Sequence, residues 1–213
     1  MGEVTTLKKS NGEVLHIIDG MYVIGAGGAC EVVDRPCRTR KKVIDGMYLA
    51  ETCCKFIFDE YYYDDEKTTL YIPNLETTTL DPDIGCYVDL EMLVIESEVL
   101  ESLPPEIGNL SGLEKLGIRS EVLESLPSEI GNLSNLKELY AYNNNLESLP
   151  SEIGNLSNLE YLYLNNNNLE SLPKEMKNLT NLTSVYLKDN NFTDDYKDYI
   201  KDDLLSFVQH LVL

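Results

Sequence analysis

Few side chains in this chain have the types and spacing needed for chemistry. The two histidines, His16 and His210, have no serine, cysteine or carboxylate near them in a pattern that serves nucleophilic or acid–base catalysis. The segment DNNFTDD at 189–195 is acidic, but it lacks the glycine and the ligand spacing of a calcium-binding loop. We therefore expect a protein that is not an enzyme and that has no cofactor and no metal.

The five cysteines also give no clear site. Cys30, Cys37, Cys53, Cys54 and Cys86 form an odd set with an adjacent pair and no C-x-x-C spacing, which argues against a zinc site or a disulfide framework. Because the first 14 residues contain no apolar stretch typical of a secretory signal, we expect reduced thiols and a cytoplasmic location.

A secreted or surface-displayed location is the alternative, and N-x-S/T sequons would matter for it. Six are present, at Asn109, Asn132, Asn155, Asn178, Asn181 and Asn191. All but the last arise within a repeated phrase, so copying of that phrase explains them better than glycosylation does.

The charge is strongly negative and unevenly distributed. The net charge is −20, with eight basic and seven acidic residues in 1–55 but nine basic and thirty acidic residues in 56–213. This field repels nucleic-acid backbones and anionic membrane surfaces and attracts basic protein surfaces. No apolar run is long enough to span a membrane. We expect a monomeric chain and a protein partner, for which the charge favours a basic surface.

Tyrosines recur at a fixed spacing and are the best candidates for binding. The spacing between Tyr48 and Tyr71 recurs along the sequence, and the positions it marks are Tyr48, Tyr71, Val94, Gly117, Tyr140, Tyr163 and Tyr186. Tyrosine offers a large, stiff contact area with a polar tip, which suits recognition surfaces. The alternative is that aromatic residues suit strands and were copied by duplication. This alternative explains the tyrosines in the similar copies near the C-terminus. It explains Tyr48 and Tyr71 less well, because the sequence around them has diverged.

The elements that position these tyrosines are sequence repeats with the same constant step. Four copies run from 100 to 191 and begin at Leu100, Leu123, Leu146 and Leu169; the third reads LESLPSEIGNLSNLEYLYLNNNN. A fixed period of this kind indicates a solenoid, in which each unit buries its apolar face against its neighbours. Apolar residues, one asparagine and one proline recur without slippage, for example at Leu136, Leu139, Ala141, Asn144, Leu146, Leu149, Pro150, Ile153 and Leu156.

This pattern resembles the leucine-rich repeat, and its wording is similar to Ras-suppressor-like proteins and to bacterial proteins of the leptospiral type. The resemblance implies an α/β solenoid with a curved parallel β-sheet, helical or 3-10 turns on the convex side, and protein–protein recognition on the concave face. A scaffold or adaptor is the expected role, and an adhesin or ligand receptor is the alternative. The predicted partner-binding residues are Tyr48, Tyr71, Glu96, Arg119, Tyr140, Tyr142, Asn143, Tyr161, Tyr163, Asn165 and Tyr186. Flanking positions on this face include Met92, Lys115, Glu138, Asn166, Lys188 and Asp189.

The resemblance also gives a role to the asparagine column of Asn144, Asn167 and Asn190. In the family this side chain lies inside and binds backbone groups of the turn, since an amide both donates and accepts. Two earlier coils have Glu98 and Glu121 in that column. Ionised glutamate only accepts, so we expect these two turns to differ in shape, with the glutamates outside.

Three regions are expected along the chain. Residues 1–44 form an N-terminal cap, either a hairpin around the Asp-Gly of 14–25 or a degenerate repeat. Residues 45–192 form the leucine-rich repeat solenoid. Residues 193–213 show helical apolar spacing and predict a C-terminal capping helix with Thr193 or Asp194 as its N-cap.

Overall fold

The computed structural model describes residues 68–213 in full and, before them, the backbone of the strands β1 to β6. The chain divides into two compact units, Met1–Glu60 and Tyr61–Leu213. The coil predicted over Met47 and Leu49, together with Tyr48 and Cys54, lies outside the described residues and stays a prediction.

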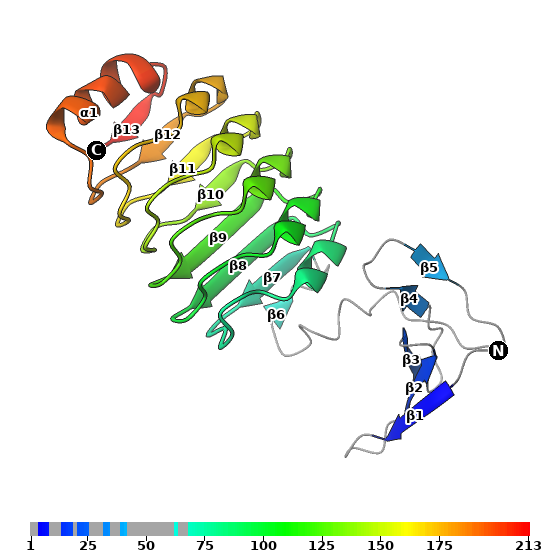
Figure 1. Cartoon of the computed structure of the whole chain (residues 1–213). Coiled ribbons are helices and arrows are strands. Elements are labelled where there is room, and N and C mark those ends of the chain that lie inside the picture. Colours follow the sequence, from blue (N-terminus) through cyan, green and yellow to red (C-terminus); the bar gives the residue numbers. More distant parts are fainter. Residues whose placement is uncertain are drawn as a thin grey trace. The chain divides into compact units, whose positions relative to one another are not determined.

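The first unit contains two small antiparallel arrangements. Strands β1 (Val4–Lys8), β2 (Val14–Ile18) and β3 (Met21–Gly25) pair in the order β1-β2-β3, and β4 (Val32–Asp34) pairs with β5 (Thr39–Lys41) (Figure 1). The register pairs Ile18 with Met21. Strands β2 and β3 are therefore the hairpin that the sequence offered as one alternative, and its role as a cap stays a prediction.

The second unit is a solenoid built on one open sheet. In the described part of the chain the strand order is β13-β12-β11-β10-β9-β8-β7-β6, and the seven strands β7 to β13 are parallel (Figure 1). Their bounds are β6 Tyr62–Tyr63, β7 Thr69–Ile72, β8 Met92–Ser97, β9 Lys115–Ser120, β10 Glu138–Tyr140, β11 Tyr161–Tyr163, β12 Ser184–Tyr186 and β13 His210–Val212. The predicted parallel β-sheet solenoid is confirmed.

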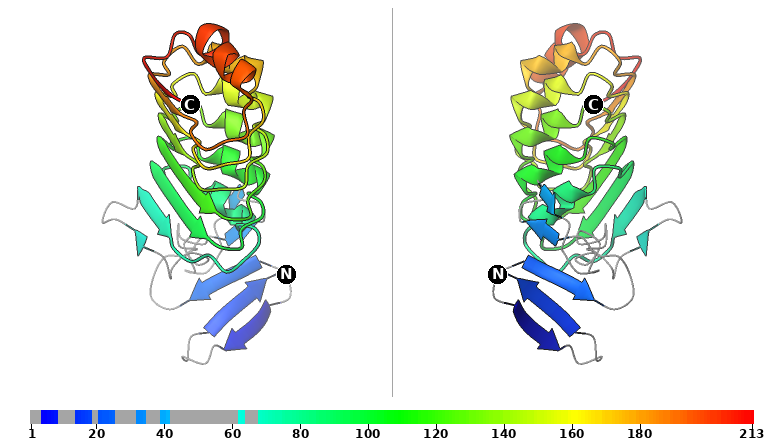
Figure 2. Two further views of the ribbon diagram at one scale, coloured as in Figure 1. Left: turned by 90° about the vertical axis from the view of Figure 1, so that its left-hand side faces the viewer. Right: turned by 90° about the vertical axis from the view of Figure 1, so that its right-hand side faces the viewer.

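Short 3-10 turns lie on the opposite side of each coil from the sheet (Figure 2). Within residues 68–213 they are η2 Pro82–Cys86, η3 Pro105–Asn109, η4 Ser128–Asn132, η5 Ser151–Asn155 and η6 Lys174–Asn178. A proline in extended conformation precedes each of the last four. Proline fits there because its missing N–H is not needed at the start of a helical turn.

Glycine permits these turns to stack closely. A side chain at Gly108 would bring its Cβ to 2.5 Å from the Glu129 backbone oxygen of the next coil. Gly85, Gly108, Gly131 and Gly154 occupy the same position in successive turns, and Lys177 occupies this position in the last of them, η6. The coil after η6 has a longer helix instead of a 3-10 turn. Lys177 pairs with Asp203 of that coil at 3.1 Å.

The leucines of the repeat fill the interior. Leu162 and Leu164 of one coil, and Leu169, Ile153 and Leu156 around them, are fully buried. Adjacent strands pair residues that occupy the same place in successive repeats, so Leu116, Leu139, Leu162 and Val185 form one continuous row. Each buried leucine or isoleucine removes enough apolar surface from water to contribute about 1.5–3 kcal/mol.

The asparagine column forms the expected internal ladder. The Asn167 Nδ2 donates to the backbone oxygens of Ala141 and Leu164 at 2.8 and 2.9 Å, and its Oδ1 accepts from the Leu146 N–H at 3.1 Å. Asn190 repeats the arrangement one coil later. Each side chain thus satisfies backbone groups of two coils.

The coils with glutamate in this column have a different turn, as predicted. Glu98 and Glu121 are exposed, and Ser97 and Ser120 take over the buried position. The Ser97 Oγ donates to the Leu75 oxygen at 2.7 Å and accepts from the Leu100 N–H at 3.0 Å. Strands β8 and β9 consequently run for six residues, whereas β10, β11 and β12 run for three.

The C-terminal helix is shorter than predicted. Helix α1 (Asp194–Tyr199) begins after Thr193, whose side chain accepts from the Tyr196 N–H at 3.3 Å, and the π-helical turn η7 (Ile200–Leu204) follows. The chain then forms β13, which adds to the sheet beyond residue 192. Strand β12 offers unpaired backbone groups, and bonds such as Leu187 N to Val212 O at 2.7 Å satisfy them. These sheet bonds outweigh the helical spacing of the last residues.

Candidate partner-binding surface

Alternate residues of the strands face away from the core and form one outer surface, which we call the sheet face. Along β8 the residues alternate between half-buried and buried, and β10 and β11 repeat the pattern. Because side chains of a strand alternate between its two sides, the residues between the buried leucines all lie on the sheet face. The register places one residue from each strand side by side, in the order Tyr71, Val94, Gly117, Tyr140, Tyr163 and Tyr186.

Three of these tyrosines form a stacked ladder. The ring centroids of Tyr140 and Tyr163 are 4.7 Å apart with an interplanar angle of 11°, and those of Tyr163 and Tyr186 are 4.7 Å apart at 7°. This separation equals the spacing of neighbouring strands, so the sheet itself sets the stacking distance. All three side chains are half-buried. The ladder is therefore a rigid aromatic ridge across β10, β11 and β12.

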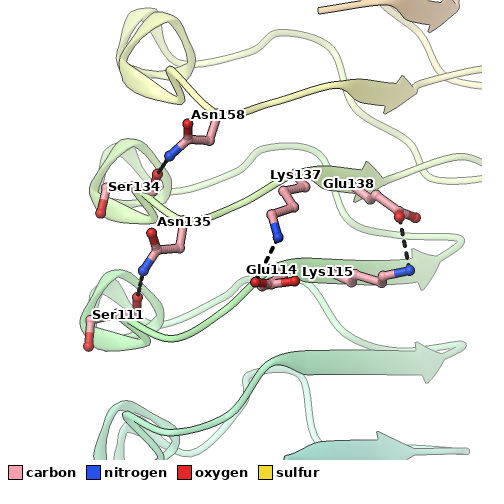
Figure 3. Close-up of polar contacts among 8 residues, drawn as sticks. All are labelled: Ser111, Glu114, Lys115, Ser134, Asn135, Lys137, Glu138 and Asn158. Atoms are coloured by element: carbon pink, nitrogen blue, oxygen red, sulfur yellow. Dashed lines mark hydrogen bonds and ion pairs between the residues drawn. The ribbon is translucent and has the colours of Figure 1, made fainter. Parts of the chain in front are cut away.

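One end of the ladder is fixed by a charged network. The Tyr140 hydroxyl donates to Glu138 Oε2 at 2.5 Å. Lys115 Nζ lies 2.9 Å from Glu138 Oε1 (Figure 3). Burial and the hydrogen bond to Glu138 raise the pKa of Tyr140. Burial alone would raise the pKa of Glu138, but the hydrogen bonds from Tyr140 and Lys115 outweigh it, and the pKa is lowered. Tyr140 is thus held protonated beside an ionised carboxylate.

The predicted site residues in β7 to β9 are also on the sheet face. The Tyr71 hydroxyl donates to Glu96 Oε2 at 2.8 Å, which joins the first two described coils. Glu96 pairs in register with Arg119, which is exposed. Here Val94 and Gly117 separate Tyr71 from the ladder.

The remaining predicted residues lie beside or at the end of the ladder. Tyr161 and Asn165 are half-buried, and Tyr142 is 38% exposed. Asn143 has a positive φ of 55° and accepts from Asn166 Nδ2 at 2.6 Å, so it shapes the turn. Of the predicted partner-binding residues, only Tyr48 lies outside the described part of the chain.

Lys115 and Glu138 were predicted only as flanking positions, and their ion pair was missed. Opposite charges at the same column of adjacent copies are the sequence signal that could have found it. A second pair of this kind, Lys137 with Glu114 at 2.8 Å, lies near the strand starts (Figure 3). The hydrogen bond to Glu114 raises the pKa of Lys137.

An amide ladder along the border between sheet and turns is structural. Asn135 donates to the Ser111 oxygen and Asn158 to the Ser134 oxygen, each at 2.8 Å (Figure 3). Asn181 donates to the Ser157 oxygen at the same distance of 2.8 Å. These residues recur once in each repeat and satisfy the backbone of the preceding coil. They are therefore part of the stacking between coils and not part of the candidate site.

Within residues 68–213, no group of three or more histidine, cysteine, aspartate or glutamate residues could hold a metal ion. No helix in this part of the chain is long and apolar enough to cross a membrane. His210 is an exposed residue of the edge strand β13.

One cysteine departs from the sequence prediction. Cys86, at the end of η2, is disulfide-bonded, whereas we expected reduced thiols. The odd count and the spacing of the cysteines gave no sign of this bond, because disulfide pairing depends on distance in the fold.

Stacked strands, 3-10 turns and an internal asparagine ladder define a solenoid repeat protein with an aromatic outer face. The family model of the leucine-rich repeat region matches residues 74–212, and the chain belongs to the leucine-rich repeat family. Proteins of this family are typically non-catalytic and generally mediate protein–protein interactions.

Solved structures show the same fold. The chain is similar to a leucine-rich repeat protein of Leptospira interrogans, with 33% identity and a TM-score of 0.59 over 63% of this chain and 34% of that one. It is also similar to the leucine-rich repeat domain of the type III effector XopL, with 25% identity and a TM-score of 0.52 over 60% of this chain and 46% of that one. The match thus spans less than half of each of these two solved chains. The comparison with curated proteins finds no match.

Proposed function

We propose that this chain is a non-catalytic binding module that holds a protein partner on the sheet face. The stacked ladder of Tyr140, Tyr163 and Tyr186 is the observation that carries the proposal. The core of the solenoid does not require aromatic rings there, because the buried leucine rows already close the interior. Stiff, amphipathic rings lose little conformational freedom on binding, which is why they serve as interface anchors.

The charge of the chain supports a partner with a basic surface. The net charge is −20, and a field of this sign steers basic proteins toward the module. A monomeric scaffold or adaptor fits this role.

The test removes the ladder without touching the core. Tyr140, Tyr163 and Tyr186 are all changed to alanine, and protein captured from the source cell is compared with that captured by wild type. A matched control changes Ser128, Ser151 and Lys174 to alanine, because these exposed residues lie on the turns of the same coils. We expect the tyrosine variant to lose the partner and the control to retain it. Equal capture by all three proteins would move the binding site off the sheet face.

A secreted or surface-displayed adhesin or ligand receptor is the second candidate. The disulfide of Cys86 favours it, because disulfides persist in oxidising compartments. The sequon asparagines Asn109, Asn132, Asn155, Asn178, Asn181 and Asn191 are all exposed, as glycosylation would require. Labelling of free thiols on the intact protein, together with localisation of the full-length gene product, separates this candidate from a cytoplasmic adaptor. Unlabelled Cys86 in protein from the cell exterior would establish it.

A further inference from the structure

The tyrosine column is interrupted at Gly117, and the interruption lies directly beside the ladder. The register places Gly117 between Val94 on one side and Tyr140 on the other. Tyr140 stacks on Tyr163 with one ring face, so its opposite face is turned toward β9, where Gly117 has no side chain. We call the space bounded by Val94, Gly117 and Tyr140 the Gly117 gap.

The fold does not demand glycine at this position. The nearest atoms to a Cβ on Gly117 would belong to Val94, with the two methyl carbons at 3.4 and 3.5 Å, which is ordinary van der Waals contact. The residue has no left-handed backbone conformation that a larger side chain would resist. Glycine inside a strand also weakens it. The stacking glycines of the 3-10 turns differ, since Gly108 would bring its Cβ to 2.5 Å from a backbone oxygen.

The size of the gap matches one planar side chain. Strands lie about 4.8 Å apart, so one ring fits between Tyr140 and Val94 at the spacing that the ladder already uses. The Tyr140 ring lines one side of the gap. Its hydroxyl bond to Glu138 and its stacking on Tyr163 hold it in place before a partner binds. Such preorganisation lowers the entropic cost of binding.

Arg119 supplies the charge beside the gap. It follows Gly117 by two residues on β9 and is exposed, and its side chain makes no ion pair or hydrogen bond with any residue of 68–213. Every other arginine of the chain lies between residues 35 and 40. The other charged groups at the gap are occupied, because Lys115 pairs with Glu138 and Glu96 accepts from Tyr71. An unpaired guanidinium in so acidic a chain is complementary to a carboxylate.

We propose that the Gly117 gap receives one aromatic side chain of an extended protein segment, and that an acidic residue two positions away in that segment pairs with Arg119. In an extended chain, side chains two residues apart point to the same side and lie about 6.8 Å apart, the same separation as Gly117 and Arg119 along β9. The aromatic ring would extend the ladder by one place. The rest of the partner's surface is basic, as the charge of the whole chain favours. This inference rests on the proposed function and adds the specificity of the site.

Three acetylated, amidated peptides test it, each titrated into the isotope-labelled full chain. Gly-Trp-Ser-Asp-Gly carries the aromatic and acidic pair, Gly-Trp-Ser-Lys-Gly reverses the charge, and Gly-Leu-Ser-Asp-Gly removes the ring. We expect the backbone amide signals of Val94, Gly117 and Tyr140 to shift most with the first peptide. The lysine peptide should bind about two- to five-fold more weakly. Stronger binding by the lysine or leucine peptide, or no shift at these residues with any peptide, would overturn the proposal.

A substitution that fills the gap is the sharpest variant. Gly117→Tyr would occupy the space with the residue that the column carries elsewhere, and affinity for the tryptophan–aspartate peptide should fall about five- to ten-fold. Its melting temperature should equal or exceed that of wild type, so loss of binding cannot be loss of folding. Ser151→Tyr adds a ring at an exposed position of the turn η5, away from the sheet face, and should bind as wild type does. Unchanged affinity in Gly117→Tyr would refute the gap as the site.

The two proposals can fail separately in the partner-capture assay. If Gly117→Tyr retains the partner while the triple tyrosine variant loses it, the gap is refuted and the sheet face stands. If both variants retain the partner, the sheet face is refuted as well. Loss of the partner by both, with retention by Ser151→Tyr, supports the two together.

Discussion

Leu162 and Tyr163 are neighbours in β11, yet Leu162 is fully buried and Tyr163 lies half-buried on the sheet face, stacked between Tyr140 and Tyr186. One peptide bond thus separates a residue of the core from a residue of the outer surface. Strand alternation places these two side chains in different environments, and mutation can test their roles independently.

Truncation of the buried residue should be costly. Leu162→Ala leaves a cavity in the continuous leucine row, and we expect it to reduce the free energy of unfolding by about 2–5 kcal/mol. The triple alanine variant of Tyr140, Tyr163 and Tyr186 should unfold nearly as wild type does. Denaturant titration of both proteins measures the difference, and a large loss in the tyrosine variant would contradict the surface assignment.

The internal amide ladder should contribute more than the amide ladder at the border. Asn167→Ala removes three hydrogen bonds and leaves buried backbone groups unpaired, so it should cost about 1–3 kcal/mol or more. The exposed Asn158 makes one such bond, to the Ser134 oxygen, and Asn158→Ala should change stability by less than about 0.5 kcal/mol. Equal losses in thermal unfolding would show that the buried position has no special role.

Two glycines of the solenoid should respond in opposite ways to alanine. Gly108→Ala forces a collision with the Glu129 oxygen, and overpacking of this kind costs about 1–3 kcal/mol. Gly117→Ala has the Val94 methyl groups as its nearest contacts, at 3.4 and 3.5 Å, and should leave stability unchanged or slightly higher. Melting temperatures of the two variants provide the comparison, and a destabilised Gly117→Ala would mean that the gap is smaller than the register indicates.

Glu138 should make stability depend on acid pH. Its folded-state pKa lies below its unfolded value, so its contribution is complete above the unfolded value of about 4.3 and is lost as the pH falls through the folded value. Glu138→Gln keeps the shape but removes the titration, so its stability should decline less between neutral and acidic pH. Glu170→Gln, at an exposed position, is the control and should follow wild type. Parallel profiles for Glu138→Gln and wild type would contradict the network.

Local physics explains why so much of the solenoid was predictable. The constant repeat period fixes which leucines stack, and strand alternation then fixes which tyrosines face outward. The departure at Glu98 and Glu121 was also readable, because a glutamate cannot donate to the turn as Asn167 does. The sequence did not show that Ser97 and Ser120 replace the amide or that their strands are longer. Only the structure shows these two features.

The sequence by itself determined the repeat family, the parallel sheet, the buried rows and the outward column from Tyr71 to Tyr186. Only the tertiary structure decided the contacts between coils and the end of the chain. The ring stacking and the Lys115–Glu138–Tyr140 network depend on distances between residues of different coils. The final strand β13 likewise forms because β12 offers it unpaired backbone groups. The apolar spacing of the last residues could not predict this pairing, because the free edge of β12 exists only once the preceding coils have stacked.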